Sequence, residues 1–101
     1  EASVQANRIQ NDALAAIANE YGPRVAALGT VPLQDSEAAV TELKRAMNEL
    51  GLLGVEIGTN VNGTYLGDQQ FRPFWAAAEE LGAFIEIHPV PGIGGSASRY
   101  L

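Results

Sequence analysis

The feature that most constrains the fold is a unit of helix, glycine and short apolar strand that occurs three times along the chain. The units recur roughly every 30 residues, the size of a strand–helix–strand crossover. The first helix has an apolar stripe at helical spacing, formed by Ile9, Ala13, Ile17 and Tyr21. Gly22 and Pro23 end this helix, and RVAALGTV, residues 24–31, is predicted to be a buried strand.

The second and third units repeat this order. Asp35 or Ser36 can cap the second helix, whereas Pro73 fits only the first turn of the third. Both helices end at a glycine, Gly51 and Gly82. The strands that follow are LLGVEIG, residues 52–58, and AFIEIH, residues 83–88.

Strands that alternate with helices pair in parallel, either in an eight-fold barrel or in an open doubly wound sheet. In both architectures function lies at the carboxyl ends of the strands. The long loops of this chain, residues 31–36, 58–68 and 88–98, fall at that end, and the reverse connections are single-glycine turns. This asymmetry predicts an α/β fold in which about three consecutive β/α units form part of a (β/α)8 TIM barrel.

Composition narrows the classes of partner. The formal charge of −6 disfavours nucleic acid, and no apolar run is long enough to cross a membrane. The chain contains no cysteine, which fits a reducing compartment, and we expect a cytoplasmic protein. The sequence starts without methionine and stops where an apolar segment begins, so residues 1–101 are expected to be one segment of a barrel domain, incomplete at both ends.

His88, the only histidine, is the last residue of the third strand. Because strand residues alternate between faces, Phe84, Glu86 and His88 are predicted to face the barrel interior. Ile85 and Ile87 then face the helix layer. An inward imidazole can bind a divalent metal or act as a base, and the alternative is a polar residue at a solvated strand end.

Other polar residues are weaker candidates. Glu56 shares the inward face of its strand, so Glu56 and Glu86 are expected either to orient His88 or to pair with a cation outside this chain. Asn60 and Asn62 could hydrogen-bond a polar substrate, although Asn62-Gly63 is first a turn signal. Arg99 could hold a carboxylate, with plain solvent exposure as the alternative. These residues supply too few ligands for a catalytic metal site on their own.

Three stretches taken together resemble a known family: VPLQD, GLLGVEIGTNVNG and FRPFWAAAEELGAFIEIHP. In order and without large gaps, they are similar to the amidohydrolase-related family that contains aminocarboxymuconate-semialdehyde decarboxylase. The resemblance implies a distorted, metal-dependent hydrolase-type barrel, with His88 matching the family's histidine ligand at the end of a middle strand. The family's His-x-His pair, catalytic histidine and aspartate have no counterpart here, so the catalytic residues of this protein are unknown.

The resemblance also implies an activity. In the intact protein it implies a carboxy-lyase that releases carbon dioxide from an unsaturated or aromatic carboxylic acid, with zinc as the expected metal and manganese as the alternative. A metal-dependent hydrolase or hydratase is the second reading, and an inactive fragment that only packs is the third. We expect a small carboxylic acid as the ligand, no tight metal binding by this segment alone, and a homodimer as one option for the parent.

Overall fold

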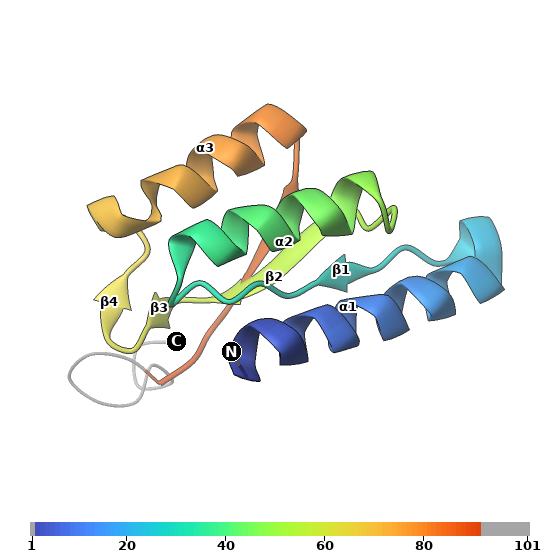
Figure 1. Cartoon of the computed structure of the whole chain (residues 1–101), viewed down its shortest axis with the longest axis horizontal. Coiled ribbons are helices and arrows are strands. Elements are labelled where there is room, and N and C mark those ends of the chain that lie inside the picture. The colour runs from blue at the N-terminus through green and yellow to red at the C-terminus, as the bar shows by residue number, and fades with distance from the viewer. Residues whose placement is uncertain (1, 92–101) are drawn as a thin grey trace.

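The computed structural model describes residues 2–91, in which three parallel strands form one sheet (Figure 1). The sheet order is β1-β2-β5, so strands adjacent in sequence are adjacent in space. Their bounds are Leu28–Gly29 for β1, Gly54–Gly58 for β2 and Phe84–His88 for β5. The predicted parallel pairing is therefore confirmed, and the arrangement is that of consecutive units of a partial barrel.

Three α-helices form a layer over one face of this sheet. Their bounds are Ala2–Tyr21 for α1, Ser36–Asn48 for α2 and Arg72–Leu81 for α3, with short 3-10 helices η1 (Gly22–Arg24) and η2 (Gln69–Phe71). Figure 1 shows α2 between α1 and α3. The side chain of Asp35 caps α2, Pro73 lies in the first turn of α3, and Gly82 ends that helix at φ 66°. These three local predictions are confirmed.

The main core lies between α2, α3 and the helix-facing side of the strands. Val55 and Ile57 of β2 are buried there, together with Leu43 of α2 and Phe74 of α3. Ile85 of β5 packs against the same cluster. The alternation within β2 leaves Glu56 exposed on the opposite face, as the period of two requires.

The first predicted strand is wrong in length, because β1 covers two residues instead of eight. Arg24 belongs to η1, and Val25 and Ala26 are exposed. A strand exists only where its backbone finds a partner, and the register partners of β1 on β2 are those of Leu28 and Gly29, preceded by one hydrogen bond from the Leu53 amide to the Ala27 carbonyl. An apolar run alone does not show where that pairing stops.

Two apolar features of the sequence are exposed in the structure, the stripe of α1 and Ile87 of β5. The α1 stripe is exposed in the structure, with exposed fractions of 61% for Ile9 and 51% for Ile17. The buried residues of α1 are Asn11 and Ala15, on another face of the helix. Ile87, expected under the helices, is 50% exposed, so this expectation is wrong.

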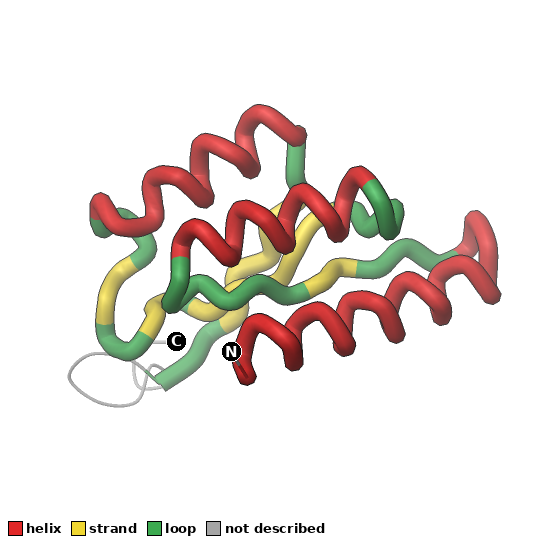
Figure 2. The backbone as a smooth tube through the Cα atoms, viewed as in Figure 1, coloured by secondary structure: helices red, strands yellow, loops and turns green. Residues whose placement is uncertain are grey.

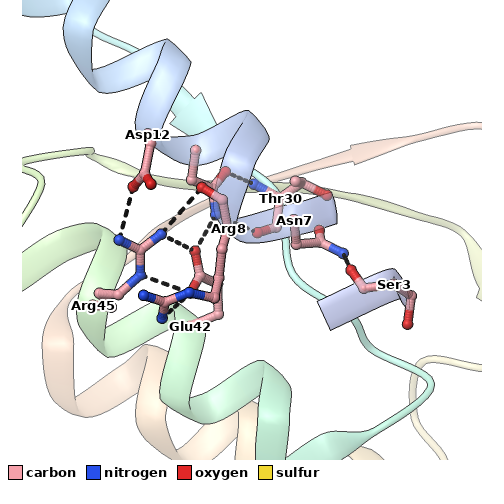
Figure 3. A network of polar contacts seen from close by, with 8 residues as sticks. Ser3, Asn7, Arg8, Asp12, Thr30, Glu42 and Arg45 are labelled. Atoms are coloured by element: carbon pink, nitrogen blue, oxygen red, sulfur yellow. Dashed lines mark hydrogen bonds and ion pairs between the residues drawn. The ribbon is translucent and has the colours of Figure 1, made fainter. Parts of the chain in front are cut away.

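A polar network explains why α1 buries an asparagine. The Asn11 side chain accepts from the Thr30 amide and donates to the Thr30 carbonyl, both at 2.8 Å, and also donates to Glu42 at 2.7 Å. Arg45 holds Glu42 through two hydrogen bonds and reaches Asp12 at 2.8 Å (Figure 3). Burial alone would raise the pKa of Glu42, but the hydrogen bonds from Arg45 and Asn11 outweigh burial and lower it. The network therefore fastens α1 to α2 and to the end of β1.

Within the described residues, no helix combines the length and apolar character needed to cross a lipid bilayer.

Candidate functional site

An open hollow of about 360 Å³ lies at the carboxyl ends of the strands. Its walls come from β2, β5, the loop after β1, and a small hairpin formed by β3 (Asn60–Val61) and β4 (Thr64–Tyr65). Six polar residues line it: Thr30, Gln34, Glu56, Asn60, Asn62 and His88. The long loops of the sequence also fall at this end of the strands, where a functional site was expected.

His88 is the last residue of β5 and is paired in register with Gly58 of β2. Its ring is exposed and lines the hollow. The Nδ1 atom lies 3.0 Å from the Pro89 carbonyl oxygen. Because a carbonyl only accepts hydrogen bonds, this contact favours the tautomer with hydrogen on Nδ1. The lone pair of Nε2 is then available to a metal ion or a proton.

Glu56 and Glu86 occupy the same register position on neighbouring strands. A side-chain hydrogen bond with Glu56 raises the pKa of Glu86, and the nearby like charge adds to the rise, while His88 opposes it. The neighbouring Glu56 carboxyl therefore disfavours ionisation of Glu86. The structure places the side chains of Glu56 and Glu86 beside each other. The group that faces Nδ1 of His88 is the Pro89 carbonyl.

The hairpin residues lie as follows. Asn60 accepts a hydrogen bond from the Gly63 amide at 3.0 Å through Oδ1 and donates to the Pro91 carbonyl at 3.2 Å through Nδ2. Asn62 is exposed at the tip of the turn, with φ 51°, and Gly63 follows at φ 83°. The turn signal in Asn62-Gly63 is thus confirmed. Arg99 lies outside the described residues, so its predicted substrate contact is untested.

Three further contacts at the site were not predicted from the sequence. The Thr59 hydroxyl lies 3.3 Å from the Val90 amide nitrogen and 3.4 Å from the Val90 carbonyl oxygen. A Cβ on Gly58 would meet a methyl group of Val90 at 3.0 Å, so this side chain packs directly on Gly58. Figure 2 shows the loop after β5 running toward the end of the molecule that carries β3 and β4. No spacing in the sequence signals these contacts, because the two contacts of Thr59 join residues 31 positions apart and the contact of Gly58 reaches the same distant residue, Val90.

The donor set fits one position of a divalent metal site. His88 offers a neutral imidazole at a strand end, with its second nitrogen held by a carbonyl, which is the usual setting of a metal-binding histidine. Between residues 2 and 91, no group of three or more histidine, cysteine, aspartate or glutamate residues is placed to hold a metal. The described part of the chain therefore supplies a single ligand and not a complete site.

Comparison with known proteins decides the family. A family model described as amidohydrolase matches residues 2–100. The chain belongs to the amidohydrolase family. Within this family, the chain is 42% identical over 84 residues to the 2-amino-3-carboxymuconate-6-semialdehyde decarboxylase of Dictyostelium discoideum, a match that covers 83% of this chain. It is 33% identical over 93 residues to a gamma-resorcylate decarboxylase of a Rhizobium species, covering 86% of this chain.

Solved structures of the amidohydrolase family share the arrangement. The chain superposes on 5-carboxyvanillate decarboxylase from Sphingomonas paucimobilis with a TM-score of 0.86 and 33% identity, over 96% of this chain and 29% of that one. A second such decarboxylase, from Novosphingobium aromaticivorans, has bound manganese and superposes with a TM-score of 0.83 and 33% identity, over 87% of this chain and 25% of that one. The chain spans 23% and 28% of the length of the two relatives compared by sequence.

Proposed function

We propose that the full-length protein is a metal-dependent decarboxylase of a small aromatic or unsaturated carboxylic acid, with His88 as one metal ligand. The observation that carries this proposal is the position of His88, which ends a barrel strand and lines the hollow, with Nδ1 facing the Pro89 carbonyl. The sequence relatives named above are decarboxylases, and the two solved neighbours act on an aromatic acid, which supports the reaction and the substrate class.

The metal is proposed to be divalent. A bound divalent ion supplies Lewis-acid chemistry, polarising an oxygen atom of the substrate or of water. The manganese bound to the Novosphingobium neighbour supports a divalent ion in this protein as well. Manganese and zinc are the two candidate ions. His88 would hold the ion through Nε2, while the Pro89 carbonyl keeps the hydrogen on Nδ1.

Residues of this chain also shape the substrate space. Thr30 and Gln34 from the loop after β1 offer hydrogen bonds to hydroxyl or carboxylate groups. Val31, Leu33 and Val90 supply an apolar wall that suits a planar ring. A mixed polar and apolar hollow of this kind fits a small substituted ring better than an extended polymer.

The proposal is tested with the purified full-length protein. Carbon dioxide release is measured from 2,6-dihydroxybenzoate, 5-carboxyvanillate and 2-amino-3-carboxymuconate-6-semialdehyde, with manganese or zinc added after chelation. We expect release from at least one acid, loss of release on chelation, and recovery with one of the two metals. A metal-loaded protein that releases no carbon dioxide from any of them would refute the decarboxylase assignment.

A further inference from the structure

We propose that Thr59 and Asn60 are positioning residues that fasten the segment after β5 and thereby set the tautomer and the aim of His88. This inference rests on the proposed function, because it concerns how the proposed metal ligand is held. It goes beyond that function because it assigns a positioning role to Thr59 and Asn60, at the start of the hairpin.

The segment after β5, residues 89–91, is held by contacts outside the sheet. Residues 89–91 follow β5 without regular secondary structure, so the sheet does not hold them. Their fixed contacts come from the residues just after β2. The Thr59 hydroxyl contacts both the amide and the carbonyl of Val90, and Asn60 donates to the Pro91 carbonyl at 3.2 Å.

The side chain of Val90 packs on β2 next to these hydrogen bonds. Val90 lies directly on Gly58, where an added Cβ would meet the Val90 methyl groups at 3.0 and 3.2 Å. Gly58 is in turn the register partner of His88 across the two strands. The contact of Val90 with Gly58 and its two contacts with Thr59 fix this residue relative to β2. Pro89 therefore sits between two anchored residues, His88 in the sheet and Val90 on β2.

The Pro89 carbonyl connects this segment to the His88 ring. The Pro89 carbonyl is the group that faces Nδ1 of His88, at 3.0 Å. Its direction depends on the backbone on both sides of it. Fastening Val90 and Pro91 holds this carbonyl toward the ring, which keeps the hydrogen on Nδ1 and leaves Nε2 for the metal.

The side chain of Asn60 fits this role better than a substrate contact. Its Oδ1 atom accepts from the Gly63 amide, and its Nδ2 atom donates to the Pro91 carbonyl. Both ends of the amide are thus engaged within the protein. Asn60 joins the turn of the hairpin to the loop after β5 and couples their positions.

The test uses three substitutions and one control substitution in the full-length protein. Thr59→Val removes the hydroxyl and keeps the shape, and Thr59→Ser restores the hydroxyl. Asn60→Asp keeps the acceptor for Gly63 and removes the donor to Pro91. Thr64→Val is the matched control, because Thr64 lies in the same hairpin, in β4, whereas the hydrogen bonds to Val90 and Pro91 come from Thr59 and Asn60.

The first readout is the ring tautomer of His88 in the metal-free protein, from nitrogen chemical shifts in long-range proton–nitrogen spectra. We expect the Nδ1–H tautomer in the wild type, Thr59→Ser and Thr64→Val, and a mixture of tautomers in Thr59→Val and Asn60→Asp. The second readout is manganese affinity, which Thr59→Val should weaken about tenfold, the usual effect of losing a group that orients a ligand. If Thr59→Val does not fold, the Asn60→Asp tautomer decides, since its turn contact is retained.

The outcomes separate the two proposals. An unchanged tautomer and unchanged manganese affinity in Thr59→Val would overturn the positioning role, even if the wild type releases carbon dioxide. If Thr59→Val and Asn60→Asp show the predicted tautomer mixture but the wild type releases no carbon dioxide, the positioning role stands and the proposed reaction is overturned.

Discussion

Gly54 is the residue at which a single atom matters most for the sheet. A Cβ at this position would lie 1.9 Å from the Phe84 carbonyl oxygen and 2.6 Å from the Phe84 nitrogen. These atoms belong to the backbone of β5, which cannot rotate away as a flexible side chain would. The close approach of β2 to β5, and hence the register that places His88 beside Gly58, depends on a glycine here.

Gly54→Ala is predicted to destabilise the protein by about 3 kcal/mol or more, because the added methyl group forces the two strands apart. The measurement is urea unfolding of the full-length protein. Gly67→Ala is the control: its Cβ would meet nothing within 4 Å, so we expect a change within about 0.5 kcal/mol. Equal stability of the two variants would show that β2 and β5 are not paired as described.

Glu42→Gln is predicted to cost about 2 kcal/mol, since Arg45 then loses a buried charged partner. The pKa of Glu42 is lower in the folded than in the unfolded protein. The stability it adds is therefore fully present above the unfolded-state pKa and is lost as the pH falls through the lower folded pKa.

Unfolding measured between neutral and acidic pH checks this sign. The wild type should lose more stability on acidification than Glu42→Gln, and the two curves should converge at low pH. Glu80→Gln changes an exposed residue of α3 and should leave the wild-type pH dependence in place. Parallel curves for the wild type and Glu42→Gln would contradict the role of the network.

At the scale of elements, what the sequence predicted correctly was local. Glycine takes a positive φ at Gly22, Gly51 and Gly82, and each of these glycines follows a helix. Asp35 caps its helix through its own side chain. These outcomes depend on residues close in sequence, so they can be inferred without knowing the fold.

The errors came from contacts between distant residues. The α1 stripe shows that one face of the helix is apolar, but periodicity does not say which face meets the sheet. The structure turns Asn11 inward because its amide pairs both backbone groups of Thr30, 19 positions away. The length of β1 likewise depends on its partner strand. Within the site, the placement of His88 followed from strand alternation, whereas the contacts of Thr59 with Val90 had no local signal.

At the scale of the whole molecule, the described residues expose several large apolar side chains. Phe84 on the inner face of β5 is 59% exposed, and Ile9, Ile17 and Tyr21 form the exposed stripe of α1. Such surfaces are usually covered by further protein.

Residues 1–101 expressed alone are therefore predicted to self-associate. Sedimentation velocity over a range of concentrations should show species larger than the monomer, and Ile17→Glu should reduce them without loss of helix content. A monomer with a cooperative thermal transition at every concentration would contradict this prediction.

The proposed role of His88 as a metal ligand is tested by His88→Ala in the full-length protein, with bound metal and carbon dioxide release determined on the same preparation. The wild type should retain about one metal ion per chain, as a catalytic site does. The variant should lose most of the metal and the carbon dioxide release together, while its far-ultraviolet circular dichroism stays unchanged because the ring is exposed. Full metal occupancy with wild-type turnover in the variant would contradict the account.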